Sequence, residues 1–314
     1  MAEITCLKNS ETKKYIIPTD TWLEPLNPLI TNLSSRGKLI LARMANKNKV
    51  IVKITKNLDL FRIKYISHIV QKIPNFPKVY CVFECNEDES NFNTNYLNIN
   101  GFCHEKSDKF KIILEIMKLY PNKISEYNNK LNIQQIKPIL KQLIFGLMYA
   151  FELTGFIHGD LHIENILINK FEEEKELTYI IKHKTFKIKT KEEYIILDFD
   201  KSITYDKTYM SLPFFTESNT LIYSIKKIIS VCAILFKKEK KYEQDPLNIA
   251  LDRGLRKIHY DMVDQGISIL TSYYQESRNY TEFREESIND VITFVNLFWK
   301  ELYNEYLFPN KYNK

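Results

Sequence analysis

The chain has 314 residues, of which 44% are hydrophobic and 13% aromatic. This composition supplies enough apolar surface for a sizeable core and excludes a wholly disordered protein. The formal net charge is +6, which is too small a surplus over this length to predict a specific nucleic-acid partner. The five cysteines are odd in number and irregularly spaced, which predicts a reducing compartment.

Neither end of the chain nor its interior predicts export or a membrane span. The N-terminal stretch MAEITCLKNSETKK has no apolar core of the kind that a signal peptide needs. The longest apolar run, IISVCAILF at 228–236, is less than half the length of a bilayer span. We therefore expect a cytoplasmic protein that is not secreted and has no transmembrane segment. Peripheral membrane association stays open.

The first third of the chain predicts a sheet. Residues 38–54 give two β-rich runs around a polar ANKNK turn, which is typical of a hairpin. Residues 58–72 have a helical period that stops at Pro74. The runs VYCVF and KIILEIM predict two more strands, and the polar stretch 86–109 between them predicts an exposed loop.

From about residue 118 the pattern becomes helical. Residues 134–154 place apolar side chains three and four positions apart, and Gly155 stands just past the predicted helix end. Apolar runs at 166–168 and 195–197 predict strands, and the alternating stretch between them predicts an inserted hairpin. We interpret the charged run EEEKEL at 172–177 as a solvated loop tip. The rest of the chain is expected to be mostly helical, so the fold class is α+β.

A short polar break at 156–169, FIHGDLHIENILIN, carries the candidate chemistry. It offers Asp160 and Asn165, and a later string, ILDFD, offers Asp198. The upstream strand VIVKI carries Lys53. One lysine and three carboxylate or amide side chains suit phosphoryl transfer from a magnesium nucleotide, because that reaction depends on positioning and charge neutralisation. His158 is interpreted as a structural histidine that braces the loop.

These strings resemble the protein-kinase-like family from about residue 33 to at least 236. HGDLHIEN is similar to the catalytic loop H-R-D-L-x-x-x-N, ILDFD to the D-F-G segment, and VIVK to the V-A-I-K strand. The resemblance implies a bilobal fold. A small β-rich N-lobe would span residues 1–117, and a larger helical C-lobe would span 118–314.

The resemblance also implies a role for each site residue. Asp160 would accept the proton of the substrate hydroxyl, and His162 would either donate to the γ-phosphate or be a satisfied loop residue. Asn165 and Asp198 would hold Mg²⁺, with Mn²⁺ as the alternative metal. The residues implied to bind ATP are Lys53, Ser34, Ser35, Gly37 and Leu39 near the phosphates, with Leu114 as gatekeeper and Glu115 and Met117 offering backbone groups to adenine.

Several positions depart from the family pattern. Gly37 is the one glycine kept in the phosphate-covering loop, and Asp200 replaces the glycine of D-F-G. No glutamate occurs between Lys53 and Glu84, where the family supplies the ion-pair partner of the lysine; this favours a weak or inactive enzyme. Gly159 replaces the arginine that in many protein kinases pairs with a phosphorylated loop, which predicts an enzyme that is active without that switch.

The inserted hairpin, the DFD string and the lack of A-P-E are similar to the divergent serine/threonine kinases of poxviruses and other large cytoplasmic DNA viruses, and to haspin-type kinases. By that resemblance, we expect an ATP-dependent kinase that acts on protein Ser or Thr in the host cytoplasm and the virion. Two alternatives stay open. One is a small-molecule kinase of the aminoglycoside or choline type, for which H-G-D-L-H-x-x-N is the usual spelling; the other is a pseudokinase that acts as a binding module. The sequence predicts no oligomeric state.

Overall fold

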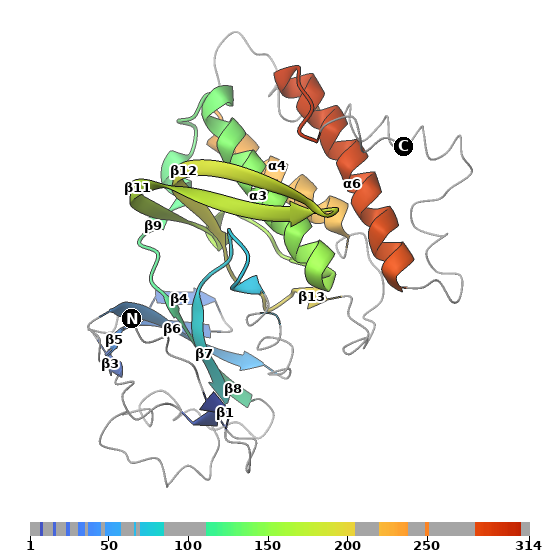
Figure 1. Cartoon of the computed structure of the whole chain (residues 1–314). Helices are drawn as coiled ribbons and strands as arrows, with labels where there is room; N and C mark the ends of the chain where they lie inside the picture. The colour runs from blue at the N-terminus through green and yellow to red at the C-terminus, as the bar shows by residue number, and fades with distance from the viewer. Residues whose placement is uncertain are drawn as a thin grey trace. The chain divides into compact units, whose positions relative to one another are not determined.

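The computed structural model describes residues 7–8, 15–16, 23–25, 31–34, 37–44, 48–57, 66, 70–84, 111–204, 220–237, 249–250 and 280–308. Over these residues the fold is α+β, as predicted, with antiparallel sheets and a few long helices (Figure 1). The chain divides into two compact units. The first comprises Met1–Lys72 and Pro77–Tyr120, and the second comprises Ile73–Phe76 and Pro121–Lys314.

The first unit is built on an antiparallel sheet in the order β3-β5-β6-β8-β7, with β4 pairing with β5. The register confirms the hairpin predicted over 38–54 and the two strands predicted from VYCVF and KIILEIM. Of the helix predicted over 58–72, only Ile66 and Val70 are described as helical, and the loop predicted at 86–109 lies outside the described residues. The strands are β3 (Leu23–Pro25), β4 (Thr31–Ser34), β5 (Gly37–Met44), β6 (Lys49–Asn57), β7 (Val79–Glu84) and β8 (Lys111–Lys118), beside a separate pair of β1 (Leu7–Lys8) and β2 (Tyr15–Ile16).

The central helix of the second unit is α3 (Ile133–Thr154), which confirms the helix predicted over 134–154. Its start is fixed by Asn132, whose side chain accepts hydrogen bonds from the backbone of Gln134 and Gln135. Its end is fixed by Gly155, which adopts a left-handed φ of 65°. Two further helices, α4 (Leu221–Leu235) and α6 (Tyr280–Tyr303), belong to the same unit and contact α3 and each other. Among the described residues, no helix combines the length and apolar character that crossing a bilayer requires.

A long antiparallel hairpin packs against α3 (Figure 1). It consists of β11 (Ile166–Ile181) and β12 (Lys184–Ile196), and the short β9 (Asn122–Lys123) pairs with the other edge of β11. The predicted inserted hairpin is therefore confirmed. The turn at Lys182 and His183 has φ of 48° and 59°, as a tight hairpin turn requires. The Lys182 N–H donates to the Glu152 carboxylate, which ties the turn to the end of α3.

The prediction that 172–177 is a loop tip is wrong. These residues lie within β11, and the turn comes at Lys182–His183. Glu172 to Glu176 are exposed because they occupy the solvated part of a long strand. The register shifts between Lys170 and Lys175, so the charged run marks an irregularity in the pairing rather than a reversal of the chain.

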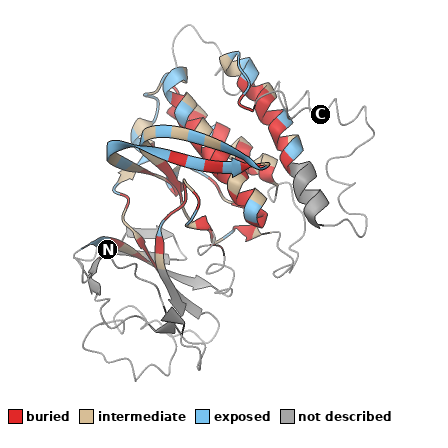
Figure 2. Cartoon of the chain, viewed as in Figure 1, coloured by how far each residue is buried: buried red, intermediate tan, exposed pale blue. Residues whose placement is uncertain are grey.

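Aromatic side chains join the hairpin to the helices. Buried and exposed residues alternate along part of β11, as expected of a strand with one face on the core (Figure 2). Tyr179 is one of the buried residues, between two exposed neighbours. The ring centroid of Phe145 on α3 lies 5.5 Å from Tyr179, 5.0 Å from Phe186 on β12 and 5.4 Å from Phe308. These edge and tilted contacts form part of the core of the second unit.

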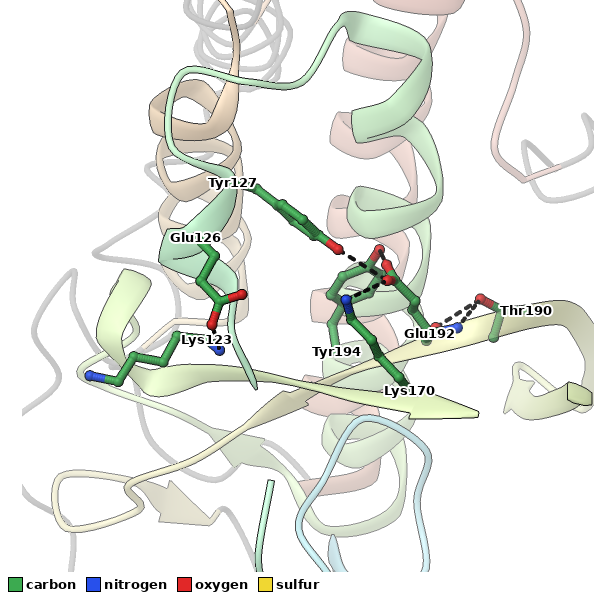
Figure 3. Close-up of polar contacts among 7 residues, drawn as sticks. All are labelled: Lys123, Glu126, Tyr127, Lys170, Thr190, Glu192 and Tyr194. Carbon is green, nitrogen blue, oxygen red and sulfur yellow. Dashed lines mark hydrogen bonds and ion pairs between the residues drawn. The ribbon is translucent and has the colours of Figure 1, made fainter. Parts of the chain in front are cut away.

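A carboxylate at the base of the hairpin connects three elements (Figure 3). Glu192 accepts hydrogen bonds from the hydroxyls of Tyr127 and Tyr194, each at 3.0 Å, and Lys170 Nζ lies 3.7 Å from it. Tyr127 belongs to the 3₁₀ turn η2 (Ile124–Tyr127), whereas Lys170 lies opposite Glu192 on β11. The backbone carbonyl of Glu192 also accepts from Thr190 at 2.7 Å. This cluster fixes the segment between β8 and α3 onto the hairpin.

The segment Ile73–Phe76 enters the second unit through a buried asparagine that the sequence did not single out. Asn75 has no exposed surface and a φ of 72°. Its Nδ2 donates to Gln142 Oε1 at 3.1 Å and to the Tyr194 carbonyl at 3.0 Å, and its Oδ1 accepts from the Tyr179 hydroxyl at 2.8 Å. The side chain is therefore fully engaged between α3 and the hairpin.

We expect Asn75→Ala to lower the free energy of unfolding by about 3 kcal/mol, because the tyrosine hydroxyl and the glutamine lose their buried partner. The measurement is urea unfolding of the whole chain followed by circular dichroism. Asn129→Ala is the matched control, since Asn129 also has a positive φ, 54°, but is exposed. It should cost about 1 kcal/mol, the backbone strain alone. Equal losses in the two variants would show that the Asn75 side chain contributes nothing beyond its backbone conformation.

Candidate active site

The candidate site of the second unit lies where two distant segments of the chain run antiparallel. β10 (Phe156–Ile157) follows α3 directly and pairs with β13 (Ile203–Thr204). The loop that carries Asp160 leaves β10, and the ILDFD segment leads into β13. This pairing holds the two polar strings identified in the sequence beside each other.

The residue before Asp198 is held through both of its backbone groups. The Leu197 N–H donates to the Asn165 carbonyl at 2.8 Å, and the Leu197 carbonyl accepts from His158 Nε2 at 2.7 Å. One residue earlier, the Ile196 N–H donates to the Asn75 carbonyl at 2.7 Å. Asp198 itself has a left-handed φ of 67°. Backbone hydrogen bonds therefore connect the stretch that carries Asp160 and Asn165 to the residue that precedes Asp198.

Asn165 is buried and links the loop to itself. It lies at the end of the 3₁₀ turn η3 (Ile163–Asn165), and its Nδ2 donates to the Asp160 carbonyl at 3.0 Å. Among the described residues, no donor hydrogen-bonds the Asn165 Oδ1. That oxygen and the Asp198 carboxylate are hard ligands of the kind that Mg²⁺ prefers, so these side chains fit the predicted metal. No cluster of three or more His, Cys, Asp or Glu suited to a metal occurs in the part of the chain that the structure describes.

His158 is a structural residue, as predicted. It is completely buried, and burial lowers the pKa of its imidazole from 6.5 to about 4, so the ring is neutral. Because Nε2 donates to the Leu197 carbonyl, Nδ1 is the acceptor for the Asp160 N–H at 3.3 Å. The ring also packs edge-on against Phe156 and Phe199. The neutral ring thus satisfies both nitrogens while joining the loop to the ILDFD segment.

Gly159 is required by a close backbone crossing. Its φ is 74°, and a Cβ at this position would lie 2.5 Å from the carbonyl oxygen of Lys201. Ser202, the residue after Lys201, donates a hydrogen bond from its hydroxyl to the His158 carbonyl at 2.9 Å. Lys201 then places its Nζ 2.8 Å from Asp160 Oδ2. Lys201 was not among the predicted site residues, because its contact with Asp160 depends on the pairing of β10 with β13.

His162 is exposed and starts η3 without capping it through its side chain. Its two alternative roles, a donor to phosphate or a satisfied loop residue, stay predictions. The neighbouring Glu164 lies 3.7 Å from Lys123, an exposed ion pair between η3 and β9. Such a pair adds little stability.

The predicted ATP-binding residues lie on neighbouring strands of the first unit. Lys53 on β6 is directly opposite Leu39 on β5 and Glu115 on β8. Ser34 pairs with Gly37 at the β4–β5 connection, whereas Ser35 lies outside the described residues. Leu114 and Met117 both lie within β8.

Glu115, which was predicted to offer backbone groups to adenine, lies inside strand β8. Glu115 is buried, with 7% of its surface exposed. At this position β8 pairs with β6 on one side and with β7 on the other. The backbone groups of Glu115 therefore face neighbouring strands. Its side chain shares a sheet face with that of Lys53, because directly opposed residues of antiparallel strands point to the same side.

Comparison with known proteins gives a similar viral sequence. No protein-family model matches the chain. The chain is 26% identical over 163 residues to the uncharacterized protein 179R of Invertebrate iridescent virus 6. The match covers 51% of this chain and 12% of the viral protein, so the chain spans only a small part of that relative's length.

The buried histidine predicts a specific dependence of stability on pH. In the folded state the pKa of His158 is about 4, and in the unfolded chain it is 6.5. Above 6.5 neither state is protonated, whereas between 6.5 and 4 only the unfolded state gains a proton. The free energy of unfolding should therefore fall with the pH by about 1.4 kcal/mol per unit through this window.

Urea unfolding of wild type and His158→Gln at several pH values isolates this effect, because the other titrating groups are common to both proteins. As the pH falls through the window, wild type should lose about 2–3 kcal/mol more than the variant. Parallel curves for the two proteins would contradict a buried neutral histidine.

Proposed function

We propose that this protein is an ATP-dependent phosphotransferase of the protein-kinase-like family that phosphorylates serine or threonine hydroxyls of proteins. The observation that carries the proposal is the double anchoring of Leu197 by His158 and Asn165, at 2.7 and 2.8 Å. Those bonds join the H-G-D-L-x-x-x-N loop to the D-F-D segment, the two strings on which the resemblance depends. Chance similarity of short strings gives no reason for them to meet in this way.

Asp160 is the proposed proton acceptor. Its backbone is held on both sides, because its N–H donates to His158 and its carbonyl accepts from Asn165. A carboxylate on so constrained a backbone can orient a substrate hydroxyl and take its proton as the hydroxyl oxygen attacks the γ-phosphorus. Asn165 and Asp198 are the proposed ligands of the magnesium ion, which would supply charge neutralisation on the nucleotide phosphates.

On the nucleotide side, Lys53 is the proposed phosphate ligand and Glu115 its charge partner, in place of the glutamate absent between Lys53 and Glu84. The register that places Glu115 opposite Lys53 supports this assignment.

The connection between β8 and α3 favours a protein substrate over a small molecule. It contains only the two-residue β9 and the one-turn η2, which Glu192 fastens to the hairpin. A small-molecule kinase of the aminoglycoside or choline type usually builds its substrate pocket from a helical insertion at this point. The viral relative supports a viral source, and we propose the host cytoplasm and virion as the setting.

Asp160→Asn should abolish phosphoryl transfer while leaving nucleotide binding intact. We expect kcat for transfer from labelled ATP to casein to fall at least about 100-fold. Binding is followed by the rise in melting temperature with Mg-ATP, which should match that of wild type. Glu176→Gln is the matched control, because Glu176 forms a similar exposed ion pair, with Lys187 at 2.7 Å, away from the site.

Two outcomes would overturn the proposal: no rise in melting temperature for wild type with Mg-ATP, or full transfer activity in Asp160→Asn. Transfer to amino-alcohols but not to casein would instead favour the small-molecule kinase. Binding without transfer to either substrate would favour the pseudokinase.

A further inference from the structure

The proposed base, Asp160, has a cation beside it, Lys201, which the sequence resemblance does not predict. Lys201 Nζ lies 2.8 Å from Asp160 Oδ2, and the two side chains keep 55% and 36% of their surface exposed. An exposed pair of this kind contributes at most about 1 kcal/mol to stability. A contribution to the stability of the fold is therefore a weak explanation for the ion pair between Lys201 and Asp160.

The backbone of Lys201 is fixed relative to Asp160. Its carbonyl oxygen lies against Gly159, where a Cβ would be only 2.5 Å away. The adjacent Ser202 hydroxyl donates to the His158 carbonyl at 2.9 Å. The Ser202 N–H also bonds the Phe199 carbonyl at 3.0 Å, which makes a turn of the DFDK segment. Pairing of β10 with β13 continues this attachment for two more residues. The lysine thus projects from an anchored turn, and only its side chain is free to move.

The positive charge of this ammonium group also suits the binding of a second anion. In the free protein the ammonium group of Lys201 is paired with the Asp160 carboxylate. The same cation can stabilise a second anion that comes close to Asp160 during the reaction. The hydroxyl that gives its proton to Asp160 lies within hydrogen-bond reach of the carboxylate, and the phosphorus bonds to that same oxygen. The phosphoryl oxygens then come within reach of a side chain as long as lysine.

We propose that Lys201 is a phosphate-binding residue of this site, which pairs with Asp160 in the free protein and contacts the transferring phosphoryl group during the reaction. This inference rests on the proposed function. In the step, the substrate oxygen bonds to the γ-phosphorus while the bond from phosphorus to the bridging oxygen of ATP breaks, and ADP leaves with that electron pair. The hydroxyl proton goes to Asp160. Lys201 keeps its proton and stabilises the charge spread over the phosphoryl oxygens.

The position of His162 agrees with this assignment. The sequence resemblance places His162 where many protein kinases carry a phosphate-contacting lysine, yet its exposed ring makes no hydrogen bond to another described residue. Lys201 instead has a defined position at Asp160. The cation of the site would then come from the segment after DFD rather than from the catalytic loop.

The test compares Lys201→Met, Lys201→Arg and the control Lys187→Met, whose ion pair with Glu176 has the same length to within 0.1 Å and similar exposure. Transfer from labelled ATP to casein gives kcat and KM, and calorimetry gives the affinities for Mg-ATP and Mg-ADP. Lys201→Met should lower kcat about 100-fold with KM for casein unchanged. It should weaken Mg-ATP but not Mg-ADP, because only ATP carries the γ-phosphoryl group. Lys201→Arg should recover most of the activity, and Lys187→Met should behave as wild type.

Unchanged or increased transfer in Lys201→Met overturns the inference, as does an equal loss of affinity for ATP and ADP, which would indicate a structural effect. If Lys201→Met unfolds, Lys201→Arg decides through its ratio of ATP to ADP affinity, which must stay near that of wild type. Wild type that binds and transfers while these expectations fail leaves the proposed function standing and removes only Lys201. Wild type that binds neither nucleotide removes both.

Discussion

The geometry of the candidate active site depends on the two hydrogen bonds that hold Leu197. Its N–H and carbonyl are taken by Asn165 and His158, so the residue that follows, Asp198, leaves a fixed point of the loop. The bond from His158 requires a neutral ring with its hydrogen on Nε2, because Nδ1 accepts from Asp160. Burial maintains that state by holding the pKa of the ring at about 4. A single buried imidazole therefore connects the polar loop to the segment that carries the second carboxylate.

The same anchoring extends into the core of the second unit. The Ile196 N–H bonds to the carbonyl of Asn75, whose side chain in turn engages Gln142 and Tyr179. Of the buried side-chain polar atoms in the described residues, only the Ser224 hydroxyl oxygen lacks a hydrogen-bond partner. A network whose members are nearly all satisfied favours one arrangement over its alternatives. The loop is thereby held in position by the core of the second unit.

Features encoded in local patterns were predictable from the sequence, whereas those made by distant partners were not. The helix over 134–154 and the inserted hairpin follow from periodicities that each segment carries alone. Asn75 has no local pattern, because its side-chain partners lie 67 to 119 residues away. The hairpin turn was missed because Lys182 and His183 adopt positive φ without glycine or asparagine, so the charged run 172–177 was mistaken for the reversal. Loop residues Asp160 and Asn165 were recognisable, but the lysine that pairs with Asp160 required the fold.

Gly159 and Lys201 give a physical reason for the departure from the kinase pattern at residue 159. An arginine there would need a Cβ in the space that the Lys201 carbonyl occupies, 2.5 Å away, and a φ of 74° that side chains disfavour. Accommodating it would displace the turn that carries Lys201 and so remove the ammonium from Asp160. The arginine and the lysine thus exclude each other. A cation held beside Asp160 by the pairing of β10 with β13 belongs to the fold itself, and its presence does not depend on a modified loop. In the proposed enzyme, control would have to act on that strand pairing or on access of the substrate to Asp160.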